Sequence, residues 1–435
     1  MNEAGRSAGR WVVLGLARHR AEWFRSMSQW ATSATLPLEF VKCLSIEELS
    51  VRLTGARTFS AVLVDGSAIG VDRTIVQTAR DAGCAVLVVE DHPSRRDWLA
   101  LGASAVLAST FSPAVLLEAL AGSASMVGRA AVGVGEPAED EPESPPGRGA
   151  VAVVCGPGGT GASTVAAALA EGLGRRPETG SVVLADLALR SEQAMLHDVR
   201  DVVPGIQELV EAHRHRSLGP DGVRAHTFLV VERHYHLLLG LRRARHWTAL
   251  RPHALAAAFD ALRRSFATVV CDVTADFEGE DDAGSVDVGE RNAMARTAVA
   301  DADVVFAVGR PGVKGVHALV RVLCDLADAS VPPGRIVPVV NLAPRSPRAR
   351  AGLVATLAEL AAPALAGGST APPIFLPTRQ VEDALRDAVG MPSPLPGVVS
   401  GAFVAVRRRL GPPSEPPPDP GCERVAPGSL GRWSV

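Results

Sequence analysis

One glycine-rich turn constrains the fold of this 435-residue chain more than any other segment. The apolar run AVAVVC, residues 150 to 155, leads directly into GPGGTGAST, residues 156 to 164, and the alanine-rich segment AAALAEGL follows after Val165. Glycines let the backbone turn its N–H groups inward around an anion, and the N-terminus of a following helix adds a partial positive charge. The segment therefore predicts a strand, a phosphate-binding turn and a helix in succession.

The turn fits the P-loop pattern G-x-x-x-x-G-K-[ST] at every position but one. Gly156 and Gly161 stand in register with the two glycines, Ser163 stands at the hydroxyl that binds Mg²⁺, and Ala162 replaces the lysine. Backbone N–H groups still bind an anion without that lysine. Turnover depends far more on cations, since one positioned arginine raises the turnover rate by a factor on the order of 10³ to 10⁵. We therefore expect weak nucleotide binding with very slow hydrolysis or none; the alternative is a turn that serves packing alone.

Apolar runs alternate with amphipathic helical segments on both sides of the turn, which predicts α/β domains with mostly parallel sheets. We expect a first domain over residues 1 to 122, a flexible Gly-, Pro- and acid-rich linker over 123 to 149, a doubly wound P-loop domain over 150 to 410, and a disordered Pro-rich tail over 411 to 435. Ser45 and Glu48 have the spacing of a helix capping box. The expected strands are 11–17, 38–43, 60–65, 85–90, 104–109, 150–155, 181–186, 267–272, 303–308, 335–341 and 373–377.

Composition narrows the class of protein further. Hydrophobic residues make up 47% and charged residues 21%, which excludes wholesale disorder and fibrous classes, and a net charge of -3 gives no overall attraction to a polyanion. No apolar stretch reaches the roughly 18 residues that a spanning helix needs, and no signal peptide is recognisable. Six scattered cysteines without C-x-x-C spacing indicate reduced thiols. These features predict a cytoplasmic protein.

The paired glycines Gly158 and Gly159 give the turn a family resemblance. GGTGAST followed by VAAALA resembles the deviant Walker A motif of the MinD/ParA family, in which a signature lysine precedes the paired glycines. Pro157 stands at that position, so both lysines are missing. This resembles the lysine-poor CpaE/TadZ proteins and the actinobacterial septum-site-determining (Ssd-like) proteins. A chain with only two lysines, Lys42 and Lys314, and abundant Ala, Arg, Gly and Pro is also typical of a GC-rich genome.

Further segments extend the resemblance over residues 150 to 410. SVVLADLALRSEQAMLHD resembles the switch I strand with Asp186 as its first acid, whereas Ala188 replaces the second acid, which positions water. ATVVCDVTADF resembles the Walker B strand with Asp272 as the acid. IVPVVNLAPRSP places Asn341 where the family contacts adenine, although Leu342 replaces the arginine that follows. PIFLPTRQVEDALRDAVGMP resembles the terminal strand. The resemblance implies that ATP or ADP is bound by Gly156, Gly158, Gly159, Thr160, Gly161, Ser163, Thr164 and Asn341, and that Mg²⁺ is bound through the nucleotide by Ser163, Asp186 and Asp272.

The resemblance implies a spatial regulator that acts as a homodimer and docks partners rather than turning over ATP. It would position a Tad/Flp pilus or secretion apparatus, or regulate septum placement in cell division, from the cytoplasm or after a partner recruits it to the membrane, pole or septum. The catalytic residues are not identifiable. One alternative is a slow ATPase with a substitute cation from Arg190, Arg310 or Lys314. The other is a ParA-like, non-specific DNA-binding partition protein that uses ten arginines between residues 205 and 265, although ten acids between 272 and 303 offer these arginines internal partners.

The first domain resembles a response-regulator receiver domain in its alternation of five strands with helices. Asp65 closes a strand where a receiver is phosphorylated, but the first strand runs into GLARHR without an acid pair, and AVLAST lacks the receiver lysine. We therefore expect a pseudo-receiver used for docking; phosphorylation of Asp65 is the alternative.

Three other features have less predictive weight. The histidines of HRH (213–215) and HYH (234–236) lack ligand spacing for a metal, the acidic loop 278–290 is a candidate docking element, and the tail has no apolar stripe for direct membrane attachment.

Overall fold

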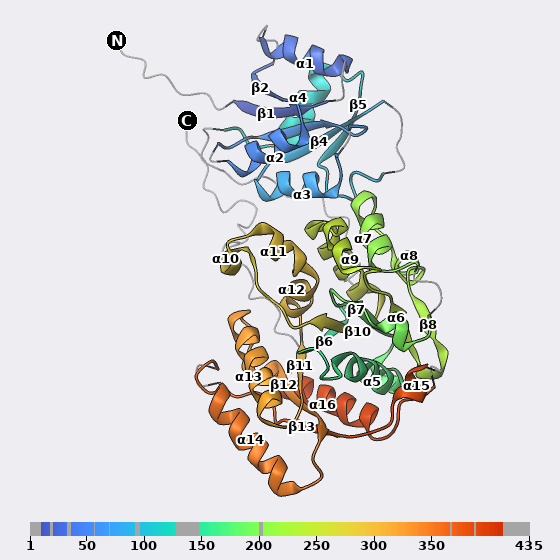
Figure 1. Ribbon diagram of the computed structural model, residues 1–435. Coiled ribbons are helices and arrows are strands. Elements are labelled where there is room, and N and C mark those ends of the chain that lie inside the picture. The colour runs from blue at the N-terminus through green and yellow to red at the C-terminus, as the bar shows by residue number, and fades with distance from the viewer. Residues whose placement is uncertain are drawn as a thin grey trace, which may run out of the picture.

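The computed structural model contains two α/β domains that follow one another along the chain (Figure 1). It describes residues 10–17, 21–32, 36–55, 57–68, 70–91, 96–127, 148–199, 203–365, 368–386 and 389–411. Most of the expected linker (128–147) and nearly all of the expected tail (412–435) lie outside the described residues. None of the described helices has the length and apolar character that crossing a bilayer requires.

The first domain is a five-stranded parallel sheet in the order β2-β1-β3-β4-β5, which is the flavodoxin-like order. Each strand falls where an apolar run predicts one. The strands are β1 (Trp11–Leu16), β2 (Leu38–Cys43), β3 (Ala61–Asp65), β4 (Ala85–Glu90) and β5 (Ala105–Ala108), and the helices are α1 (Glu22–Thr32), α2 (Ile46–Thr54), α3 (Arg73–Asp81) and α4 (Pro113–Ser123).

Apolar helix faces cover both sides of this sheet. Leu49 of α2 and Val76 of α3 pack on one face, and Met27 of α1 and Leu116 of α4 pack on the other. Ser45 caps α2 as predicted, since its hydroxyl accepts from the Glu48 N–H at 3.2 Å. The reciprocal bond is shifted by one residue from that of a capping box, because the Glu48 carboxylate accepts from the Leu44 N–H at 2.8 Å. Burial on both faces explains why the strands are continuous apolar runs rather than alternating ones.

The second domain is an eight-stranded, mostly parallel sheet in the order β13-β12-β11-β6-β10-β7-β9-β8, in which only β8 runs antiparallel to its neighbour. The strands β8 and β9 were not predicted from the sequence. The strands are β6 (Ala150–Gly156), β7 (Val182–Leu187), β8 (Phe228–Val230), β9 (Tyr235–Leu238), β10 (Thr268–Thr274), β11 (Val304–Gly309), β12 (Ile336–Ala343) and β13 (Ile374–Pro377).

Helices again cover both faces of the sheet, so the predicted doubly wound α/β fold is confirmed. The faces of α5 and α16 pack on one side, and those of α7, α9, α12, α13 and α14 pack on the other. The helices are α5 (Ala162–Gly174), α6 (Gln193–Leu196), α7 (Ile206–His215), α8 (Pro220–Arg224), α9 (Pro252–Ser265), α10 (Glu280–Ala283), α11 (Val286–Arg291), α12 (Ala293–Ala300), α13 (Val313–Asp328), α14 (Pro347–Ala361), α15 (Glu382–Arg386) and α16 (Leu395–Leu410), with short 3₁₀ turns at Pro177–Thr179, Val231–Arg233, Ala244–Ala249 and Pro333–Arg335.

The expected linker begins later than the sequence suggests. Helix α4 continues to Ser123, and Val127 pairs with Arg10 in an antiparallel bridge, so the start of the expected linker packs on the first domain. Helix α3 faces α7 and α9 of the second domain (Figure 1). The two domains are therefore in direct contact.

Candidate functional site

The phosphate-loop turn joins β6 to α5 at the carboxyl end of the central strands. Gly161, the residue before α5, has a φ of +84°, which favours glycine. A Cβ at Gly161 would meet Asn341 Nδ2 at 2.6 Å, and a Cβ at Gly156 would meet the Val308 carbonyl oxygen at 2.5 Å. Both glycines are therefore required by geometry, as the motif predicts.

The centre of the turn is open and suited to an anion. The Thr160 hydroxyl donates to the Pro157 carbonyl at 2.7 Å and stiffens the turn from inside, while Gly158 and Gly159 are exposed. Within the described part of the chain, no hydrogen-bond partner is found for the N–H groups of Gly158, Gly159 or Gly161. Together with the free N–H groups of the first turn of α5, these donors form an anion-binding site.

Arg310 supplies a cation beside the turn. Its Nη1 donates to the Gly159 carbonyl at 3.4 Å, and its side chain is exposed just after β11. Arg190 and Lys314, the other two candidates for a substitute cation, are exposed and make no hydrogen bond to the turn in the described structure. Of the three, Arg310 is the one that the fold brings to the loop.

Two carboxylates meet below the turn because their strands are neighbours. Asp186 of β7 and Asp272 of β10 are register partners, and both are buried. Asp186 accepts from the N–H groups of Ala188 at 3.3 Å and Gln193 at 2.9 Å. Asp272 accepts from the Gln193 side chain at 2.7 Å, and the same side chain donates to the Ser163 carbonyl at 3.0 Å. The three residues assigned to Mg²⁺ by resemblance are thus brought together, with a glutamine among them.

Burial dominates the electrostatics of this pair. Burial, and then the charge of Asp272, raises the pKa of Asp186 to about 8, against the lowering effect of backbone donors. Burial also raises the pKa of Asp272, to about 6, while hydrogen bonds from Gln193 and Ser163 oppose that rise. The pair therefore retains protons at pH values where ordinary aspartates are ionised.

Asn341 lies beside the turn at the mouth of a small cavity. Its Nδ2 donates to the Thr160 carbonyl at 2.8 Å and its Oδ1 accepts from the Leu342 N–H at 2.9 Å, so its amide is fixed in orientation. The cavity has a volume of about 190 Å³ and is mostly apolar. Its lining includes Gly159, Gly161, Thr164, Val165, Ala168, Leu376, Arg379, Val381 and Leu395. The cavity adjoins the turn through Gly159, Thr160 and Gly161, and contact between Asn341 and a base stays a prediction.

No sequence motif identified Gln193 as a site residue, although it is fully buried at the start of α6 beside the two carboxylates. It stands seven residues after Asp186 in a segment, SEQAM, whose polar character is typical of an exposed loop. Nothing in the local pattern distinguishes a buried glutamine from an exposed one. Its position follows from the packing of the loop after β7 against β10, where the Leu189 N–H donates to the Thr274 hydroxyl at 2.9 Å.

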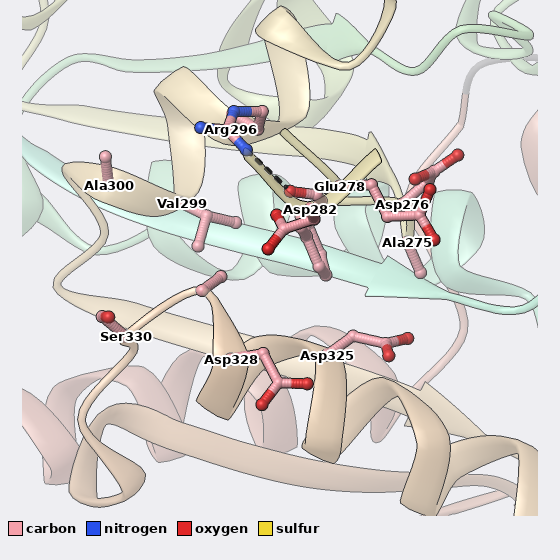
Figure 2. Close-up of a pocket in the computed structure, with 12 residues that line it drawn as sticks. Ala275, Asp276, Glu278, Asp282, Arg296, Val299, Ala300, Asp325, Asp328 and Ser330 are labelled. Carbon is pink, nitrogen blue, oxygen red and sulfur yellow. Dashed lines mark hydrogen bonds between the residues drawn. The ribbon is translucent and has the colours of Figure 1, made fainter. Parts of the chain in front are cut away.

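A larger cavity of about 710 Å³ lies away from the loop, between the segment after β10, α12 and α13. Figure 2 shows the carboxylates that line it and Arg296 among them. Arg296 donates to the Phe277 carbonyl at 3.1 Å. The acidic residues are Asp276, Glu278, Asp282, Asp325 and Asp328. Among the described residues no three acid, histidine or cysteine side chains form a group that could hold a metal. We therefore take the loop, with its oriented donors, as the candidate site.

The arginine-rich segment 205 to 265 is largely neutralised within the fold. Six of its ten arginines form ion pairs with acids, and Arg233 is completely buried. The pairs are Arg214–Asp72, Arg224–Asp221, Arg233–Glu171, Arg242–Glu208, Arg263–Asp301 and Arg264–Asp260. Fewer free cations than the sequence suggests are thus available for a phosphate backbone.

Asp65 of the first domain is also engaged in hydrogen bonds within its own chain. It is 4% exposed, and its Oδ1 accepts from both the N–H and the hydroxyl of Ser67, at 2.9 and 2.6 Å. These bonds close the turn after β3. They give Asp65 a structural role at the strand end.

Comparison with known proteins yields similarity to solved structures alone, since no protein-family model and no curated protein matches the chain. The cell division ATPase MinD of Pyrococcus furiosus matches with 16% identity over 60% of this chain and 100% of its own, at a TM-score of 0.43. A ParA family ATPase of Chlorobium tepidum matches with 16% identity over 59% and 92%, at 0.42, and the ATP complex of a Cyanothece McdA variant with 18% identity over 61% and 98%, at 0.42. Similarities of this extent do not establish an activity, so the site is judged from its own residues.

Proposed function

We propose that this protein is a MinD/ParA-like spatial regulator that binds ATP or ADP weakly at the turn from Gly156 to Thr164 and acts by docking partners. The observation that carries the proposal is the combination of an open anion-binding turn with a missing lysine. The backbone donors are in place around Gly158 and Gly159, yet Ala162 stands where the P-loop lysine would be. Such a site favours binding over catalysis.

Slow or absent turnover follows from the chemistry of phosphoryl transfer. The reaction needs positioned cations on the transferred group and an oriented water molecule. Ala188 replaces the acid that would orient water, and the exposed Arg310 is the cation that lies at the loop. Signalling by occupancy, through a homodimer whose surface depends on the nucleotide, needs neither of these groups.

For the biological role we propose the one implied by the sequence resemblance to CpaE/TadZ and Ssd-like proteins. The protein would position a Tad/Flp pilus or secretion apparatus or regulate septum placement, with pilus, secretion or cell-division proteins as partners. The first domain would act as a pseudo-receiver that docks rather than signals by phosphorylation. The engagement of Asp65 by Ser67 supports that part of the proposal.

One alternative is favoured by a specific contact. Because Arg310 reaches the loop, a slow ATPase that uses this arginine in place of lysine is the second candidate function. Loss of a measurable basal rate in an Arg310→Ala variant would identify it. DNA binding is less well supported, because most arginines of segment 205 to 265 are paired.

Equilibrium titration with labelled ATP and ADP tests nucleotide binding. The site-blocking variant is Gly161→Asp, which combines a positive φ with a clash against Asn341. The matched control is Gly219→Asp: Gly219 has a φ of -74°, open space around it and an N-cap position before α8, where aspartate is favoured. We expect binding by the wild type and the control and loss in Gly161→Asp. Equal behaviour of all three proteins, or no binding at millimolar nucleotide, would contradict the proposal.

A further inference from the structure

Gln193 makes contact with all three residues that the resemblance assigns to magnesium. Its backbone N–H donates to Asp186 at 2.9 Å, and its side-chain Nε2 donates to the Asp272 carboxylate at 2.7 Å and to the Ser163 carbonyl at 3.0 Å. The residue is 0% exposed. One residue thus connects β7, through its backbone N–H, with β10 and the first turn of α5, through its side-chain amide.

The geometry of this cluster does not fit a bound magnesium ion. Mg²⁺ requires near-octahedral oxygen ligands at about 2.0 to 2.1 Å, directly or through its waters. The Asp272 carboxylate instead receives the Gln193 amide, at 2.7 Å. Both oxygens of Asp186 are engaged by backbone N–H groups. The groups that would face a cation are turned toward donors of their own chain.

The orientation of the amide is fixed by its partners. Both contacts of Nε2 are with acceptors, a carboxylate and a carbonyl, so exchanging the amide nitrogen and oxygen would place oxygen against oxygen. The Oε1 atom has no hydrogen-bond partner within the described residues. The amide oxygen is buried without a partner among these residues, so the two hydrogen bonds that Nε2 donates are what hold this side chain in place.

We propose that the Gln193 side chain takes the place of magnesium between Asp186, Asp272 and Ser163, so that the P-loop binds nucleoside di- or triphosphates without a divalent cation. The nucleotide part rests on the proposed function; the exclusion of the cation rests on the contacts of Gln193 alone. The glutamine replaces the positive charge of the ion with two N–H donors. It also fastens the loop between β7 and α6 to Asp272 whether or not nucleotide is present.

The first measurement uses the wild-type protein and needs no variant. ATP is titrated in excess Mg²⁺ and again in EDTA, and the two affinities are expected to agree within about twofold. An affinity at least tenfold higher in Mg²⁺ overturns the inference. Binding in neither buffer overturns the proposed function instead and leaves the cation question to the second measurement.

The second measurement follows thermal unfolding with and without Mg²⁺ in the absence of nucleotide. Gln193→Ala frees the Asp272 carboxylate from its amide donor, and Gln193→Glu replaces the donor with an oxygen ligand of the same length. We expect Mg²⁺ to raise the Tm of either folded variant and to leave the wild type unchanged. The control is Gln77→Ala, which removes an exposed amide-to-carboxylate bond of 2.8 Å to Asp81. A Mg²⁺ response in the wild type, or none in Gln193→Glu, overturns the inference.

Discussion

Arg214 of α7 forms a two-armed ion pair with Asp72, which lies in the other domain. Its Nε and Nη2 donate to the same Asp72 carboxylate oxygen at 3.0 and 2.6 Å, and Asp72 is 7% exposed at its side chain. Asp72 also caps α3 by accepting from the Thr74 N–H. Asp72 is thus both the N-cap of α3 in the first domain and the ion-pair partner of Arg214 in the second. Arg73 adds a hydrogen bond between the domains by donating to the His213 carbonyl.

We expect Arg214→Ala to loosen the contact between the domains. Removing one partner of a largely buried pair leaves the Asp72 charge short of a donor, at a cost on the order of 1 to 3 kcal/mol. Small-angle scattering should report a larger radius of gyration, and thermal unfolding a lower Tm. Arg245→Ala is the control, because Arg245 is exposed and forms no ion pair within the described residues. Equal effects of the two variants would contradict this role.

Arg310→Ala should weaken nucleotide binding. Its guanidinium lies against Gly159 at the rim of the turn, so it adds a charge-assisted contact to a bound phosphate. We expect about a tenfold loss of ATP affinity, equivalent to roughly 1.4 kcal/mol. Titration of Lys314→Ala, an exposed cation in the first turn of α13, provides the comparison. A loss of the same size in both variants would indicate a general charge effect.

His213 should make stability depend on pH on the acid side. Burial, then the charges of Arg73, Arg264, His226 and Arg216, lowers its pKa to about 4, and neither ring nitrogen has a hydrogen-bond partner among the described residues. The unfolded chain takes up the proton near pH 6.5, whereas the folded chain resists it until about pH 4. Stability from this residue is therefore lost as pH falls through that window.

His213→Leu should flatten that pH dependence, because the side chain can no longer be protonated. The measurement is Tm from pH 7 down to about pH 4, with His317→Leu as the control at an exposed position. If the variant loses stability on acidification as steeply as the wild type, another group causes the loss.

Arg233→Met should destabilise the second domain strongly. Arg233 is 0% exposed and donates to the carbonyls of Ala384 and Val389, beside the buried Glu171 of α5. Its removal takes one of two cations from the buried Glu171 and leaves the Ala384 and Val389 carbonyls without these donors, with an expected cost of about 3 to 5 kcal/mol in denaturant unfolding. Arg175→Met, which removes a partner of the same glutamate that is 46% exposed, should cost about 1 kcal/mol or less. A larger loss of stability in Arg175→Met than in Arg233→Met would contradict this role of Arg233.

Much of the fold follows from the sequence because its signals are local. Apolar runs bounded by turn residues located eleven strands, and the glycine spacing located the turn from Gly156 to Gly161. The strands β8 and β9 were not predicted because they are short and lie among arginines and histidines. The pairing of β9 with β7, and of β8 with β9, depends on packing that no local period records.

The sequence by itself determined the order of eleven strands along the chain and the position of an anion-binding turn without its lysine, since both depend on residues within one turn or strand. Tertiary structure alone decided what surrounds that turn. Gln193 reaches Asp272 across 79 positions, and Arg310 reaches Gly159 across 151, because the sheet places β10 between β6 and β7 and β11 beside β6. Contacts between distant segments depend on strand order and burial, which appear only when the whole sheet is assembled.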